Sequence, residues 1–297
     1  MSATILGDAT EGVRAQSEAA AYQWCRAYAR AHDENFSVVT WFLPSDIRPH
    51  FFALYAFCRW TDDLGDEAAG DRIALLDAWE RDLRACYDGQ RESPLFVALG
   101  ATIERYDIPP EPFLRLIEAN RMDQRIASFE TYDGLLEYCD HSAAPVGRMV
   151  LYVLGYRDEE RQRLSDATCV GLQLANFWQD VSVDLAKGRM YIPLDDMRRF
   201  GYDADRLRAG IADGPFRDLM RFEVQRARDL FARGRQLEAL IDRRARVDIR
   251  LFRLGGEATL DAIERAGYDV LSSRPRVSKA AKLWLAASNG ARMRLGV

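Results

Sequence analysis

The chain has 297 residues, of which 48% are hydrophobic and 29% charged, and its formal net charge is −5 at pH 7. This composition is ordinary for a globular protein with a sizeable core. The negative charge and the even mixing of basic with acidic residues argue against a nucleic-acid partner. No uncharged apolar run approaches the roughly 18 residues that a membrane-spanning helix needs.

The N-terminus and the cysteines indicate the compartment. No basic stretch followed by an apolar run opens the chain, so we expect no signal peptide. Residues 1–16 are polar and small, and we expect them to be flexible. The five cysteines are widely spaced and form no Cys-x-x-Cys pair, which argues against a zinc site or a disulfide framework and suits a reducing compartment. We therefore predict a cytoplasmic protein.

Helical periodicity extends over nearly the whole chain, and no alternating strand pattern stands out. Pro94, Pro110 and Pro215 fall near predicted helix starts, where the missing N–H costs least. We predict an all-α fold with one domain over residues 1–297. The predicted helices cover about 19–31, 49–66, 72–87, 94–106, 110–125, 131–154, 159–184, 215–240, 247–266 and 279–288.

Three aspartates lie close together at the end of the second predicted helix. Asp62, Asp63 and Asp66 belong to the segment 59–67, which directly follows the apolar stretch 50–58. Asp62 and Asp66 share a helix face because they are four residues apart. Carboxylates this close repel one another unless a cation neutralises them. Mg²⁺ suits such oxygen ligands, because it takes a few carboxylates together with substrate phosphates. For this motif alone, a solvated acidic helix end is the alternative.

Small residues mark the middle of the helix predicted over 131–154. Ser142, Ala143, Ala144 and Gly147 lie at close spacing, and Pro145 should bend the helix there. Small side chains either let two helices pack closely or leave room beside the backbone for a bulky ligand. The segment alone favours close packing.

A second polar stripe runs along the helix predicted over 159–184. Asn176, Asp180 and Asp184 are spaced four residues apart on an otherwise apolar helix, and Gln173 lies nearly on the same stripe. Such a stripe is costly to bury unless partners satisfy it. Two facing acidic helices would hold two or three Mg²⁺ ions, with a diphosphate completing the coordination. The predicted metal ligands are Asp62, Asp63, Asp66, Asn176, Asp180 and Asp184. The five aspartates are also the predicted catalytic residues, and Asn176 is also predicted to bind substrate.

Two basic residues follow the second stripe. Lys187 and Arg189 leave the helix next to Asp184, where they can take up the charge of a departing diphosphate. A surface loop charge is the alternative when they are considered alone. Beside two acidic motifs we expect them to bind substrate, and we then expect Ser142, Ala143 and Gly147 to line a hydrophobic tunnel for a prenyl chain.

These motifs, in this order, resemble the squalene/phytoene synthase family, which joins two prenyl diphosphates head to head. The resemblance covers roughly residues 25–275 and includes the segment 32–36 and the turn 188–193. It implies the isoprenoid synthase fold, a single helical domain around a central cavity, with Mg²⁺ between the aspartate helices and a carbocation formed in an aromatic-lined cavity. By resemblance, further matched positions are Phe36, Tyr55, Arg59, Asp123, Tyr138, Gln173 and Tyr191, and all of these except Asp123 are predicted to bind substrate.

The sequence departs from the family pattern at the second motif. Many members carry Arg-Asp-x-x-Glu-Asp there, whereas this chain has Gln179 and Val183 at the arginine and glutamate positions. The segments 34–36, 142–148 and 176–181 resemble the bacterial hydroxysqualene synthases of hopanoid biosynthesis. That branch converts presqualene diphosphate and water to hydroxysqualene and diphosphate. Its implied partners are a presqualene diphosphate synthase and a flavin-dependent reductase of the same pathway.

Two other functions stay open. One is full condensation of two farnesyl or geranylgeranyl diphosphates to squalene, dehydrosqualene or phytoene; the other is a non-catalytic helical assembly protein. Five aspartates retained on two buried-facing stripes argue against the assembly protein. No GxGxxG fingerprint occurs, and we expect no NADPH. The greasy substrate suggests transient contact with the inner membrane surface.

Overall fold

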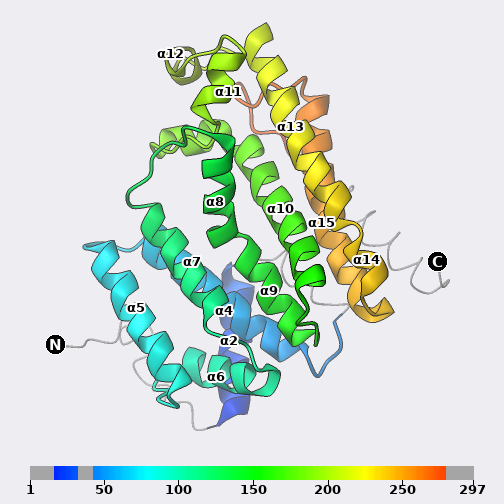
Figure 1. Ribbon diagram of the computed structural model, residues 1–297. Coiled ribbons are helices and arrows are strands. Elements are labelled where there is room, and N and C mark those ends of the chain that lie inside the picture. The colour runs from blue at the N-terminus through cyan, green and yellow to red at the C-terminus, as the bar shows by residue number, and fades with distance from the viewer. Residues whose placement is uncertain (1–16, 33–42, 279–297) are drawn as a thin grey trace. The chain divides into compact units, whose positions relative to one another are not determined.

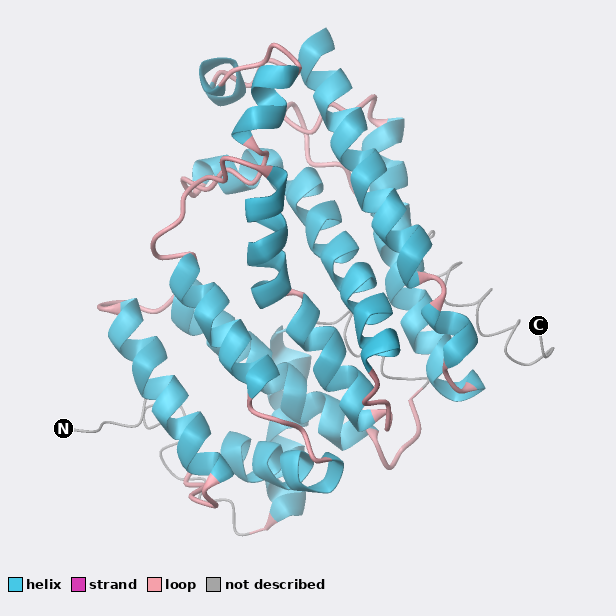
Figure 2. Cartoon of the chain, in the orientation of Figure 1, coloured by secondary structure: helices cyan, strands magenta, loops and turns pink. Residues whose placement is uncertain are grey.

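The computed structural model describes residues 17–32 and 43–278, and the regular elements in these residues are helices (Figures 1 and 2). A single parallel bridge, between Ser128 and Met190, is the only strand-like pairing in the described part. The all-α prediction is confirmed. None of the described helices combines the length and apolar character needed to cross a bilayer. The described residues divide into a first unit, residues 17–32, 43–125 and 145–158, and a second unit, residues 126–144 and 159–278.

The first unit is organised around α4. This helix packs against α2, α5, α6 and α7. Its fully buried Phe57 stacks on Trp79 of α5 and meets Phe113 of α7 edge-on, with ring centroids 5.4 and 5.1 Å apart. Aromatic pairs of this kind add about 0.5–1.5 kcal/mol beyond area burial. The helices of this unit are α2 (Glu18–His32), α4 (Arg48–Asp66), α5 (Arg72–Tyr87), α6 (Pro94–Tyr106), α7 (Glu111–Met122) and most of α9 (Ala144–Val153).

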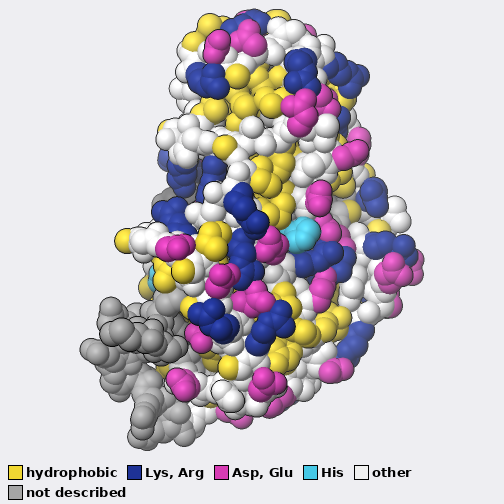
Figure 3. All heavy atoms as spheres, turned by 60° about the vertical axis from the view of Figure 1, so that its left-hand side comes forward, with side chains coloured by type: hydrophobic (Ala, Val, Ile, Leu, Met, Phe, Trp, Pro, Cys, Tyr) yellow, Lys and Arg dark blue, Asp and Glu magenta, His cyan; other side chains and the backbone are white. Residues whose placement is uncertain are grey.

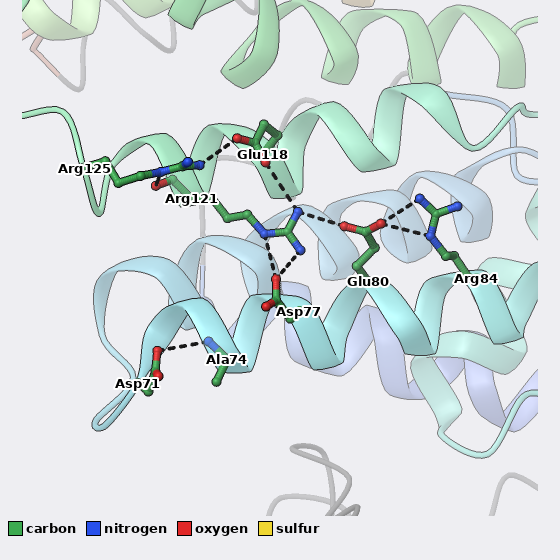
Figure 4. A network of polar contacts seen from close by, with 8 residues as sticks. All are labelled: Asp71, Ala74, Asp77, Glu80, Arg84, Glu118, Arg121 and Arg125. Atoms are coloured by element: carbon green, nitrogen blue, oxygen red, sulfur yellow. Dashed lines mark hydrogen bonds and ion pairs between the residues drawn. The ribbon is translucent and has the colours of Figure 1, made fainter.

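An ion-pair network fixes α7 on α5. Arg121, whose side chain is 15% exposed, donates to Asp77 at 2.7 Å and to Glu80 at 2.8 Å (Figure 4). Figure 3 shows basic and acidic side chains interspersed over one face of the molecule. An isolated ion pair at an exposed position contributes little to stability. The Arg121 network is partly buried and has several partners, so it holds α7 in register against α5.

The second unit is built on α10, a 28-residue helix. It packs against α13 and α15 (Figure 1), which also pack closely on each other because Gly256 of α15 leaves room for the ring of Phe231 of α13. A β-carbon at residue 256 would lie 2.3 Å from that ring. The helices of this unit are α8 (Tyr132–Ser142), α10 (Glu159–Ala186), α11 (Leu194–Arg199), α12 (Ala204–Arg208), α13 (Gly214–Gly234), α14 (Leu237–Leu240) and α15 (Arg243–Arg265).

Two predicted helices are interrupted. The helix predicted over 131–154 is two helices, because α8 ends at Ser142 and α9 begins at Ala144. Pro145 has no N–H to donate and its ring opposes a continuous helix, so the expected bend is a break. The helix predicted over 215–240 ends at Gly234, and α14 follows. The helix predicted over 279–288 lies outside the described residues.

A buried carboxyl in the second unit gives a testable pH dependence. Glu223 of α13 is fully buried and accepts hydrogen bonds from Arg226 at 3.1 and 3.3 Å. Burial raises the pKa of Glu223 to about 8 from 4.5, against the lowering effect of Arg226. The folded state therefore keeps a proton that the unfolded chain releases. The stability from this proton is fully present below about pH 4.5 and is lost as pH rises to about 8.

We expect Glu223→Gln, which mimics the protonated carboxyl, to remove this dependence. The melting temperature of the natural protein should fall relative to that of the variant as pH rises from about 5 to 8. Thermal melts followed by circular dichroism across this range provide the measurement. Parallel curves for the two proteins would contradict the assigned titration.

Candidate functional site

The first aspartate motif closes α4, and its three carboxylates have different surroundings. Asp63 accepts a hydrogen bond from the Tyr28 hydroxyl of α2 at 2.9 Å. The same carboxylate pairs with Arg59 at 2.5 Å, and Arg59 also donates to Glu67 at 2.9 Å. Asp63 is therefore held from two sides. A metal bound through Asp63 would share its carboxylate oxygens with Tyr28 and Arg59.

Asp62 has a neutral partner. Its Oδ1 accepts a hydrogen bond from Asn120 Nδ2 of α7 at 3.3 Å. Burial, together with the nearby carboxylates Asp66 and Asp63, raises the pKa of Asp62 to about 7. Asp66, four residues further along the same helix face, is exposed. A cation bound to Asp62 and Asp66 would relieve this repulsion.

The donor chemistry of the motif fits Mg²⁺. Hard carboxylate oxygens are its usual protein ligands, and it commonly binds one or two carboxylates with substrate phosphates instead of an all-protein cage. Within residues 17–32 and 43–278, no group of three or more His, Cys, Asp or Glu side chains is arranged as a ready metal site. The carboxylates here suit a metal that arrives with a diphosphate.

The second motif, on α10, has an arginine partner that the sequence pattern did not reveal. Arg274, beyond the end of α15, forms a two-point ion pair with Asp180, with Nη2 2.8 Å from Oδ2. The same Nη2 donates to Gln179 Oε1 at 3.1 Å, and Gln179 Nε2 donates to the carbonyl of Pro275 at 2.7 Å. Gln179 is 8% exposed. A buried glutamine therefore fastens the segment 274–275 to the second motif.

The end of α10 brings several predicted site residues together. Gly188 has φ 77°, which favours glycine, and it reverses the chain. The N–H of Arg189 donates to the carbonyl of Asp184 at 2.9 Å, the pattern of a helix-terminating Schellman motif. A small pocket, with room for about one water, opens at this turn. Its lining residues are Phe177, Val181, Asp184, Leu185, Arg189, Met190, Tyr191 and Ile192.

Aromatic rings adjoin this pocket. Phe177 stacks on Tyr191 with centroids 3.7 Å apart, and Tyr138 of α8 lies 6.0 Å from Tyr191. Tyr138 and Tyr191 are 4% and 8% exposed. The faces of such rings attract cations. Two predicted substrate-binding tyrosines therefore belong to one aromatic cluster beside Asp184.

Comparison with known proteins decides the family. A family model described as squalene/phytoene synthase matches residues 29–281. The chain belongs to the squalene/phytoene synthase family. It is 51% identical to the squalene synthase HpnC from Alicyclobacillus acidocaldarius, whose crystal structure matches with a TM-score of 0.83 over 85% of this chain and 96% of that one.

Other members of the squalene/phytoene synthase family extend the comparison. The chain is 32% identical to a 15-cis-phytoene synthase from Synechococcus elongatus over 89% of its length and 90% of the relative's. A dehydrosqualene synthase, solved in complex with a ligand, matches with a TM-score of 0.86 and 24% identity over 94% of this chain and 99% of that one. This last likeness shows the fold. The isoprenoid synthase fold and a prenyltransferase-type enzyme acting on prenyl diphosphates are therefore established for the chain.

The remaining predicted residues of this family member fall in both units or outside the described part. Tyr55 and Gly147 lie in the first unit, and Phe36 lies outside the described residues. Ala143 is 8% exposed, and the buried hydroxyl of Ser142 has no hydrogen-bond partner among the described residues. In the second unit, Asn176 and Lys187 are exposed and Gln173 is half-buried. The sequence pattern did not reveal Tyr28, Asn120 and Arg274, which reach the motifs across 35, 58 and 94 residues of chain.

Proposed function

We propose that the chain converts presqualene diphosphate and water to hydroxysqualene and diphosphate, in a pathway that makes squalene or hopanoids. The C–O bond to the diphosphate breaks, and both electrons leave with the diphosphate. The carbocation rearranges, water adds to it, and the adduct loses a proton. The products are hydroxysqualene, diphosphate and one proton, so no reductant is required.

The observation that carries this proposal is Gln179. Many condensing relatives have an arginine at the start of the second motif, and this chain has a neutral side chain whose amide binds Arg274 and Pro275. Arg274 itself is paired with Asp180. The second motif therefore has less net positive charge for a second diphosphate. The 51% identity to the squalene synthase HpnC supports the same branch.

The proposed roles of the residues follow from their chemistry. Asp62, Asp66, Asp180 and Asp184, assisted by Asn176, would hold Mg²⁺, which when bound would neutralise the diphosphate charge. Asp63 stays a predicted ligand and also holds Arg59 through their ion pair. The other predicted substrate-binding residues are Phe36, Tyr55, Arg59, Tyr138, Ser142, Ala143, Gly147, Gln173, Lys187, Arg189 and Tyr191.

We propose that the leaving diphosphate is stabilised beside the small pocket at the end of α10, which is too small to hold the diphosphate itself. Arg189 lines it beside Asp184, and a cation there would stabilise the developing negative charge. The adjoining rings of Tyr138, Phe177 and Tyr191 would stabilise the carbocation through their faces.

Head-to-head condensation is the second candidate function. The chain is 32% identical to a 15-cis-phytoene synthase across most of both chains, which favours this activity. In that case two farnesyl or geranylgeranyl diphosphates would be the substrates. In the favoured case, a presqualene diphosphate synthase would supply the substrate and a flavin-dependent reductase would consume the alcohol, with transient contact at the membrane surface.

Incubation of the purified protein with presqualene diphosphate and Mg²⁺, without NADPH, tests the proposal. We expect hydroxysqualene in the organic extract and diphosphate in the aqueous phase, and we expect EDTA to stop both reversibly. Absence of diphosphate release under these conditions would contradict the proposed activity.

A further inference from the structure

The space beside the first motif is shaped for one side chain of α7. Gly65 lies between Asp62 and Asp66 on α4, and a β-carbon at residue 65 would lie 2.2 Å from Asn120 Oδ1 and 3.0 Å from Asn120 Cγ. Contacts this short are incompatible with any larger residue unless Asn120 moves. Glycine at 65 therefore admits the Asn120 amide against the backbone of the metal motif.

The hydrogen bonds fix the orientation of this amide. Asn120 is 5% exposed, and its Nδ2 has two acceptors, Asp62 Oδ1 at 3.3 Å and the carbonyl of Leu116 at 3.1 Å. The Leu116 carbonyl can only accept, as does the ionised Asp62 carboxylate, so the nitrogen must face them. The neighbouring Gln124 donates from Nε2 to the carbonyls of Gly65 at 2.9 Å and Asn120 at 3.1 Å. Arg121 holds the same turn of α7 on α5 (Figure 4).

Asn120 is a neutral hydrogen-bond donor, so its effect on a metal-binding carboxylate differs from that of the charged donors Arg59 and Arg274. Asp63 and Asp180 are paired with Arg59 and Arg274, whose positive charges oppose a metal ion. An amide N–H occupies one lone pair of the carboxylate and leaves the others directed outward, without adding charge. Hydrogen bonds of this kind orient metal-binding carboxylates, and their loss typically weakens metal binding by about 10–100-fold.

We propose that Asn120 is a positioning residue that orients the Asp62 carboxylate for Mg²⁺, and that Gly65 is required because it admits Asn120. This inference rests on the proposed function, since it assigns Asp62 to the metal. Asn120 contacts neither substrate nor metal in this account. Its effect is on the metal affinity of the site.

Calorimetric titration with magnesium and inorganic diphosphate, without prenyl substrate, tests the proposal. Asn120→Ala and Gly65→Ala should each weaken binding by about 10–100-fold. The matched control is Gln124→Ala, which removes two hydrogen bonds to the same backbone but none to Asp62; it should change affinity by less than about threefold. The Gly65→Ala/Asn120→Ala double variant should bind as the Asn120→Ala single variant does, because the added methyl group then displaces nothing.

Melting curves recorded without metal show whether each variant is folded, so that weaker metal binding by a folded variant reflects lost positioning and not lost stability. If Gln124→Ala weakens binding as much as Asn120→Ala, or if Asn120→Ala binds as the natural protein does, Asn120 has no positioning role. If Gly65→Ala fails to fold, Asn120→Ala still provides the test, because that substitution only removes atoms. Asp62→Asn is the reference variant. Normal metal binding by Asp62→Asn would overturn the proposed metal site as well as the positioning role. Weak binding by Asp62→Asn together with normal binding by Asn120→Ala would overturn the positioning role alone.

Discussion

Replacing Asp62 or Asp180 with asparagine should lower turnover of presqualene diphosphate by about a thousandfold or more, which corresponds to about 4 kcal/mol of lost transition-state stabilisation. Each substitution keeps the side-chain volume and removes the charge that we assign to Mg²⁺. Steady-state release of diphosphate at saturating Mg²⁺ is the measurement.

The stability of the Asp62→Asn variant distinguishes this loss from unfolding. Burial and neighbouring carboxylates raise the pKa of Asp62 to about 7, so its ionised form destabilises the metal-free fold at neutral pH. Asparagine removes that cost, and we expect the metal-free melting temperature to stay level or rise while activity collapses. Asp218→Asn, an exposed substitution on α13, is the control and should retain full activity. Full activity of the Asp62 or Asp180 variant would refute the metal assignment.

With farnesyl diphosphate as the only substrate, the protein should form product at least about 100-fold more slowly than with presqualene diphosphate. Condensation brings two diphosphates into one site, whereas presqualene diphosphate brings one. A missing cation about 5 Å from a charged group costs about 3 kcal/mol at an effective dielectric of 20, which is about 100-fold in rate. Gln179 provides no such cation, and Arg274 is already paired with Asp180.

Product analysis with each substrate, at equal enzyme and Mg²⁺ concentrations, measures this ratio. Val183→Glu, at a position that is 41% exposed, restores one family residue without disturbing the core and leaves the position of Gln179 unchanged. It should not restore condensation, because the missing group is cationic. Efficient formation of squalene, dehydrosqualene or phytoene from prenyl diphosphates alone would instead identify the chain as a condensing enzyme, and the family and fold would stand.

Local pattern was sufficient to predict most of the helices. Apolar periodicity predicted α4 within one residue of its start and α10 within two residues of its end, since each helix buries one continuous face. At Pro145 the sequence predicted only a bend, where the helix in fact breaks after Ser142, and the break after Gly234 was missed because the apolar pattern continues across it. The short helices α11 and α12 have six and five residues, too few for a period to be recognised.

The candidate site could be predicted only as far as its local motifs. The carboxylates at 62, 63, 66, 180 and 184 were visible because their spacing repeats along a helix. Asn120 and Arg274 were not, because their partners lie 58 and 94 residues away and only the packing of α7 on α4 and the return of the segment after α15 bring them close. The sequence alone does not distinguish Asn120 from an ordinary polar residue, because only the structure shows that its amide occupies the space left by the missing side chain of Gly65.

The most direct test of the proposed chemistry follows the oxygen atom of the product. The purified protein would be given presqualene diphosphate and Mg²⁺ in water enriched in oxygen-18, without NADPH, and the extracted product analysed by mass spectrometry. We predict hydroxysqualene that carries one oxygen-18 atom, because water adds to the carbocation after the diphosphate has left. A hydrocarbon without oxygen, or an alcohol with unlabelled oxygen, would contradict the assignment.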